Sequence, residues 1–242
     1  MPRFFVLPEA IQGSMVSLGE SNAAHVKALR LRPGEEIIVS TGGKEEYRCV
    51  YRSADLAEIR SIGECETEPT VRATLFAAFP KGDKPEFITQ KAVELGAVEI
   101  CFFLSSRCIS RPDEKARKKQ LERLSRVSEE AAMQAGRGRI PTVSWLGSFQ
   151  EMAVNAATYD RALFLWEEAR EISLRRALLD NQSAPSSFAI VTGPEGGFSR
   201  EEAELAVSAG LIPITLGKRI LRCETAPLCA LSAVMYETGN LE

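Results

Sequence analysis

Two different hydrophobic rhythms follow one another along the chain. Up to about residue 69, short apolar or alternating runs are separated by turn pairs such as Pro33-Gly34 and Gly42-Gly43, and one helical pattern spans Ser21 to Leu31. This pattern predicts a small β-barrel or sandwich. Its predicted strands are Phe4–Leu7, Met15–Leu18, Glu36–Val39, Tyr47–Tyr51 and Leu56–Ile62.

After an acidic stretch that ends near Pro69, strand-length apolar runs alternate with helix signals. Alternation of this kind is typical of a doubly wound α/β domain, a parallel sheet with helices on both faces. The chain therefore divides into a predicted β-rich domain over 1–69 and an α/β domain over 70–242. The predicted strands of the second domain are Val71–Phe79, Val98–Phe103, Ala162–Trp166, Phe188–Val191 and Ile212–Leu216. The predicted helices begin at Pro85, Asp113, Ser148, Glu171, Ser199 and Pro227, and the second of them runs to about Gln134.

Two glycine-bearing loops follow the last two predicted strands. Gly193-Pro194-Glu195-Gly196-Gly197 precedes a capping box formed by Ser199 and Glu202, and Gly217-Lys218-Arg219 precedes a helix for which Thr225 is the predicted N-cap. Neither loop has the residues of a P-loop or the glycine spacing of the dinucleotide fingerprint. Because ligands of α/β sheets bind at the carboxyl ends of the strands, the two loops predict a cofactor site.

Charge and composition limit the kinds of partner. The formal net charge is −3, but residues 107–139 carry 10 basic and 5 acidic side chains, a local excess that suits phosphate binding. No apolar run approaches the length of a membrane span and the N-terminus lacks a leader pattern, so we expect a cytoplasmic protein without a membrane partner. One histidine, and six cysteines without a C-x-x-C pair, predict no metal site.

Both loops closely resemble those of the SPOUT-class RNA methyltransferases, specifically the family of ribosomal RNA small-subunit methyltransferase E. The matching segments are 193–199, which reads GPEGGFS, and 216–226, which reads LGKRILRCETA. The resemblance implies a PUA-like RNA-binding barrel at the N-terminus and a SPOUT domain whose C-terminal part forms a trefoil knot. It also implies a homodimer that transfers a methyl group from S-adenosylmethionine to N3 of a uridine in 16S ribosomal RNA, within the RNA or the assembled small subunit.

The resemblance assigns residues to cofactor binding, and the chemistry of the reaction suggests others. N3 of uracil must lose a proton, which a carboxylate such as Glu195 can accept, while Arg222 can stabilise the charge on the carbonyl oxygens. Glu224 is a third candidate. The alternatives are a helix-capping role for Glu195 and a buried ion pair between Arg222 and Glu224. The expected cofactor-binding residues are Thr192, Gly193, Gly196, Gly197, Leu216, Gly217, Ile220, Leu221, Thr225 and Ala226.

Basic residues in two regions are the expected RNA contacts. His25 to Leu31 matches a helix motif of the family's N-terminal domain, and Gln134 to Arg137 resembles its Glu-Gln-x-Gly-Arg motif, although Met133 replaces the acidic residue. A solvated helix face is the alternative for the first group. The expected RNA-binding residues are Arg3, His25, Lys27, Arg30, Arg32 and Arg137.

Two other functions are compatible with these patterns. One is a methyltransferase of the same fold that modifies a ribose 2′-OH or another base, including one in tRNA; the other is a non-catalytic RNA-binding protein. The N-terminal domain with His25 to Arg32 favours the ribosomal family over the first. The complete loop from Gly193 to Ser199 argues against the second.

Overall fold

The computed structural model describes residues 1–53, 55–179 and 185–241. It divides into two compact units, one comprising 1–68 with 129–140 and the other 69–128 with 141–242. The sequence analysis had placed 129–140 in the second domain. In the structure this segment joins the first unit because Ser40 Oγ donates to the Gly138 carbonyl (2.5 Å) and Arg137 is paired with Glu68 (2.8 Å).

The first unit is built on a six-stranded sheet in the order β1-β4-β5-β6-β3-β2, in which only the β1–β4 pair is parallel. All five predicted strands are confirmed, with ends shifted by up to two residues. The core includes Phe4, Val16, Ile37, Val39 and Tyr51. The elements are β1 (Arg3–Phe5), β2 (Ile11–Gln12), β3 (Met15–Ser17), α1 (Gly19–Leu29), β4 (Glu36–Ser40), β5 (Glu45–Ser53) and β6 (Leu56–Glu64), with a 3₁₀ turn at Pro8–Ala10.

The second unit contains a six-stranded, fully parallel sheet in the order β12-β10-β11-β7-β8-β9. The parallel sheet and the α/β alternation predicted from the sequence are confirmed. The strands are β7 (Arg72–Ala78), β8 (Glu99–Phe103), β9 (Thr142–Trp145), β10 (Arg161–Leu165), β11 (Ser187–Thr192) and β12 (Ile212–Ile214). The helices are α2 (Lys84–Glu94), α3 (Glu114–Ala135), α4 (Phe149–Ala156), α5 (Leu174–Leu178), α6 (Arg200–Ser208) and α7 (Thr225–Glu237).

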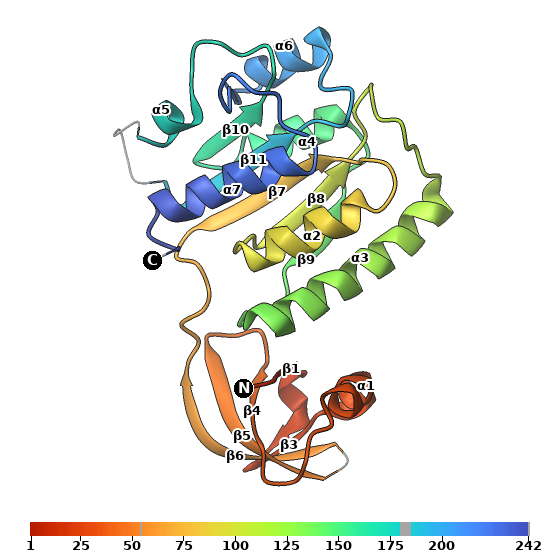
Figure 1. Cartoon of the computed structure of the whole chain (residues 1–242), viewed down its shortest axis with the longest axis vertical. Coiled ribbons are helices and arrows are strands. Elements are labelled where there is room, and N and C mark those ends of the chain that lie inside the picture. The colour runs from red at the N-terminus through yellow and green to blue at the C-terminus, as the bar shows by residue number, and fades with distance from the viewer. Residues whose placement is uncertain (54, 180–184, 242) are drawn as a thin grey trace. The chain divides into compact units, whose positions relative to one another are not determined.

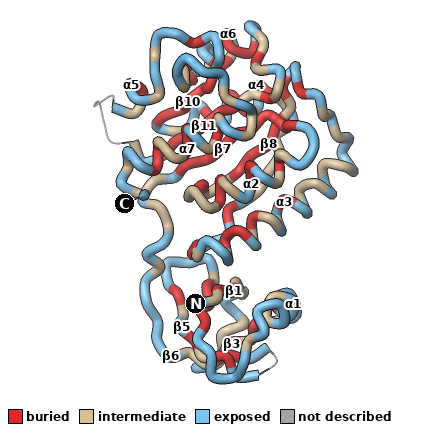
Figure 2. The backbone as a smooth tube through the Cα atoms, in the orientation of Figure 1, coloured by how far each residue is buried: buried red, intermediate tan, exposed pale blue. Residues whose placement is uncertain are grey.

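Helices cover both faces of this sheet, which explains why its strands are apolar almost throughout. Helices α2 and α7 pack together on one face and α4 and α6 on the other (Figure 1). The register aligns Leu163, Ile190, Leu75 and Ile100 in one row across four strands, and all four are fully buried. Figure 2 shows the strands β7, β8, β10 and β11 of this sheet almost entirely in the buried class.

The direction of the chain connections changes between β7 and β11. The two strands are parallel neighbours, but the chain leaves β7 for α2 on one face and leaves β11 for α6 on the other face. The connections therefore diverge at the carboxyl edge, which is where open α/β sheets bind ligands.

Candidate cofactor site

A cavity of about 1060 Å³ lies at the carboxyl edge of the parallel sheet. Segments that directly follow three strands line it: 165–170 after β10, 192–198 after β11 and 214–223 after β12. Lys84, at the start of α2, and Ala226, in the first turn of α7, complete the wall. Its size is in the range of pockets that hold a nucleoside-sized ligand.

The first loop is a tight turn held by its glycines. Gly197 donates its N–H to the Pro194 carbonyl (3.0 Å) and has φ +65°, a left-handed conformation that favours glycine. A Cβ on Gly193 would lie 3.3 Å from the Phe198 ring. The predicted capping box is confirmed, since Ser199 Oγ accepts from the Glu202 N–H and the Glu202 carboxylate accepts from the Ser199 N–H.

The second loop contains backbone groups without hydrogen-bond partners among the described residues. Thr215 Oγ1 accepts from the Gly217 N–H (3.2 Å), and Gly217 has φ +107°. From Lys218 to Leu221, the backbone N–H and C=O groups have no hydrogen-bond partner among the described residues. Unpaired backbone donors and acceptors of this kind can pair the edge of a purine. The residues present therefore fit an adenosine-bearing cofactor.

Most of the predicted cofactor-binding residues border the cavity. Two do not: Thr225, which is the first residue of α7 while Glu224 is its N-cap, and Gly196. A Cβ on Gly196 would lie 3.1 Å from the Cβ of Arg107, so this glycine allows close approach of another loop, and it does not border the cavity. Those that border it are Thr192, Gly193, Gly197, Leu216, Gly217, Ile220, Leu221 and Ala226.

Glu195 and Arg222, the predicted catalytic residues, both line the cavity. Glu195 Oε1 accepts from Lys84 Nζ (3.0 Å) and from the Lys81 N–H (3.1 Å), while its Oε2 is buried without a partner in the described structure. Burial raises the pKa of this carboxyl, but the hydrogen bonds and charge of Lys84 and the backbone donors outweigh burial, so its net pKa is lowered. The Arg222 side chain is exposed. Its expected ion pair with Glu224 does not form; Glu224 pairs with Lys84 instead (3.3 Å).

Sequence reasoning missed Lys84. Its ammonium group contacts Glu195 and Glu224 and also donates to the Cys223 thiol (3.4 Å), joining residues from both loops. The pattern predicts a helix that begins at Pro85, and nothing in the sequence marks the lysine just before it as functional. Lys84 and Glu195 are 111 positions apart in the sequence, and they meet because β7 and β11 are paired in the sheet.

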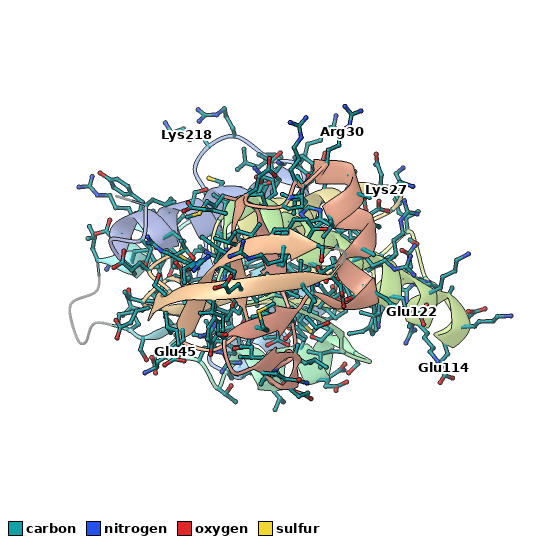
Figure 3. All side chains as sticks on the ribbon, turned by 90° about the horizontal axis from the view of Figure 1, so that it is seen from below. Lys27, Arg30, Glu45, Glu114, Glu122 and Lys218 are labelled. Atoms are coloured by element: carbon teal, nitrogen blue, oxygen red, sulfur yellow. The ribbon has the colours of Figure 1, made fainter. Side chains whose placement is uncertain are left out.

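The predicted RNA-binding residues fall into two groups. Lys27, Arg30 and Arg32 are exposed on or just after α1, and Figure 3 shows Lys27 and Arg30 projecting outward from that helix. His25 is half-buried against the Phe4 ring (5.2 Å between centroids).

Arg3 and Arg137 differ from this group, because their side chains are only 4% and 3% exposed. Arg3 is paired with Glu46 and Arg137 with Glu68, each at 2.8 Å. In this structure both arginines are therefore buried and paired within the first unit.

Two further properties bear on function. Within residues 1–53, 55–179 and 185–241, no group of three or more His, Cys, Asp or Glu side chains is arranged to hold a metal ion. Over the same ranges, no helix has the length and apolar character that crossing a membrane requires.

Comparison with known proteins identifies the class. Residues 66–235 match a family model described as an RNA methyltransferase domain. The chain is 34% identical over 230 residues to ribosomal RNA small subunit methyltransferase E of Bacillus subtilis, covering 92% of this chain and 90% of that protein. It therefore belongs to the family of ribosomal RNA small subunit methyltransferase E, as the two loops indicated.

Solved structures agree with this assignment. Ribosomal RNA small subunit methyltransferase E from Neisseria gonorrhoeae, bound to S-adenosyl methionine, superposes with a TM-score of 0.84 at 30% identity, covering 98% of this chain and 97% of that one. A putative methyltransferase from Legionella pneumophila, also with bound cofactor, gives 0.84 at 27% identity, covering 97% and 96%.

Proposed function

We propose that this protein transfers the methyl group of S-adenosylmethionine to N3 of a uridine in 16S ribosomal RNA, acting on the RNA or the assembled small subunit in the cytoplasm. The observation that carries the proposal is the cavity itself. It is bordered by the ends of three parallel strands and by unpaired backbone from Lys218 to Leu221, in a chain whose relatives bind this cofactor. When bound, S-adenosylmethionine supplies the methyl group.

The chain's own residues then have separate tasks. The cofactor is held by the eight expected cofactor-binding residues that line the cavity. Gly196 has no Cβ and so lets Arg107 pack against the first loop. Arg222, exposed at the cavity wall, stabilises negative charge that develops on the uracil carbonyl oxygens. Since the pKa of Glu195 is lowered, this group is a weak base. Its role is to accept a hydrogen bond from the N3–H group and orient the base. The proton that N3 loses when it is methylated passes to solvent water.

RNA capture falls to the first unit, which we propose is PUA-like. Lys27, Arg30 and Arg32 supply exposed positive charge, and His25 supports them through its contact with Phe4. In the second unit, the family resemblance supports a trefoil knot after β12.

A homodimer through α7 is a further part of the proposal, although much of the apolar surface of this helix is already covered. Leu231, Val234 and Met235 are buried in their own unit. The helix keeps Leu228 and Ala233 half-buried and Tyr236 66% exposed, and these residues would form the contact. Light scattering at working concentration tests it, and a monomer would contradict it.

The reaction is tested with purified small ribosomal subunits lacking the modification and isotopically labelled cofactor. Nucleoside mass spectrometry should find label in 3-methyluridine. Label in a 2′-O-methyl nucleoside or another base would support the alternative methyltransferase. Tight RNA binding without any label would support the non-catalytic alternative.

A further inference from the structure

Lys84 occupies the junction between the two loops. It is the first residue of α2, directly after the β7–α2 connection, and its side chain is 21% exposed at the cavity wall. Its Nζ lies 3.0 Å from Glu195 Oε1, 3.3 Å from Glu224 Oε2 and 3.4 Å from Cys223 Sγ. Of the three N–H donors of its ammonium group, one bonds Glu195 and one bonds Cys223, while Glu224 lies within ion-pair distance.

These contacts connect the ammonium group to residues of both loops, which favours a structural link over direct contact with a substrate. Lys84 also determines which carboxylate oxygen of Glu195 accepts its hydrogen bond. Oε1 receives Lys84 Nζ and the Lys81 N–H, both from the segment that follows β7, and Oε2 is left buried without a partner in the described structure. A buried ionised oxygen without a donor is costly, so a ligand that brings an N–H group is favoured there.

We propose that Lys84 is a positioning residue for methyl transfer, which ties the two loops together and holds Glu195 with Oε2 free to accept an N–H donor from the target base. The inference rests on the proposed function. Uracil offers such a donor at N3, and fixing the acceptor before the base arrives lowers the cost of orienting it.

The charges around Glu195 support this arrangement. The positive group facing it is Lys84, and the other titratable groups nearby are Glu224, Cys223 and Cys108. Burial, then Glu224 and Glu195, raises the pKa of the Cys223 thiol to about 11, so the thiol is neutral at physiological pH. Without Lys84, nothing among these groups offsets the burial of Glu195 or its repulsion from Glu224.

The test replaces Lys84 with methionine, which keeps length and removes charge. Lys91→Met is the matched control, because Lys91 lies on the same helix and pairs with Glu94 away from the cavity. Carboxyl ¹³C NMR, with Glu195→Gln to assign the resonance, should place the Glu195 midpoint at a higher pH in Lys84→Met than in the control. Lys84→Arg, which retains charge, should keep the midpoint low.

The functional readout is the pH dependence of single-turnover methyl transfer. In Lys84→Met, the fall in rate at low pH should begin at a higher pH, shifted by the same amount as the NMR midpoint. Adding Glu195→Gln to the wild type or to Lys84→Met should abolish this fall in rate. A uniform loss of rate without this shift would reduce Lys84 to a structural residue and overturn the proposal, as would an unchanged NMR midpoint. If the wild-type protein methylated no RNA, the proposed function would fail, while the NMR titration would still decide whether Lys84 controls Glu195.

Discussion

At the scale of single residues, Gly217 tests how the second loop holds the cofactor. Its φ of +107° strains any other residue, so Gly217→Ala should cost about 1 to 3 kcal/mol of stability and weaken S-adenosylmethionine binding by distorting the cavity wall. Gly210 is a matched control, because its φ is +95°, its Cβ direction is equally open and it does not line the cavity. Gly210→Ala should lose similar stability with unchanged affinity. Equal loss of affinity in both variants, measured by calorimetry, would contradict the loop's role.

Glycines also show what sequence could not decide at this scale. Gly193, Gly196 and Gly197 appear equivalent in the sequence, but their missing Cβ atoms would meet Phe198, Arg107 and Glu167 respectively. Only the fold determines which neighbour each glycine approaches. The glycines that line the cavity could therefore not be separated beforehand from the one that lets another loop approach.

At the scale of elements, the C-terminus of α1 carries an unusual residue. Arg30 caps the helix with φ +53°, the only positive φ of a non-glycine residue in the described chain. Glycine is the common residue at this position, so Arg30→Gly should stabilise the protein by up to about 1 kcal/mol in urea unfolding while it weakens RNA binding. Arg30→Ala should weaken binding without that gain. If glycine destabilised the protein, the side chain would have a structural role that its exposure does not suggest.

The ion pair between Glu68 and Arg137, which lies in the turn after α3, predicts that the stability of the fold depends on pH. Burial raises the Glu68 pKa, but hydrogen bonds and charge from Arg137 and the N–H groups of Gly138 and Arg139 outweigh it, so the net pKa is lowered. A lowered folded-state pKa adds stability that is complete well above the unfolded pKa of about 4.3 and is lost as pH falls through the folded value.

Glu68→Gln should therefore cost roughly 3 kcal/mol at pH 7, and the difference from wild type should shrink below about pH 4. Urea unfolding at a series of pH values measures this. Glu66→Gln, which alters an exposed neighbour, should show little effect at any pH. A pH-independent cost for Glu68→Gln would mean that the carboxylate charge is unimportant.

Periodicity predicted most elements because buried parallel strands and capped helices leave local patterns. The exceptions have local reasons. Strand β9 has only four residues and lies at the sheet edge, and α5 is confined to Leu174–Leu178 although a longer helix from Glu171 was predicted. Local sequence patterns contain no information on the order of the strands in the sheet. Since the Lys84–Glu195 contact depends on β7 lying beside β11, that part of the site could not be predicted.

At the scale of the whole molecule, the proposal separates chemistry from RNA capture. Arg222→Ala should lower the single-turnover rate about 10²- to 10³-fold with little change in RNA affinity. Lys27→Ala should instead weaken binding and reduce the log–log salt slope by about 0.7 to 0.9, the effect of one lost phosphate contact. Equal loss of rate at saturating substrate in both variants would refute this division.

The most direct test of the central claim is nucleoside mass spectrometry of 16S ribosomal RNA from cells that lack this gene. The account predicts that 3-methyluridine disappears, that wild-type protein restores it and that Arg222→Ala, produced at the same level, restores it slowly or not at all. Full retention of 3-methyluridine in the deletion strain, with loss of a different modified nucleoside, would contradict it.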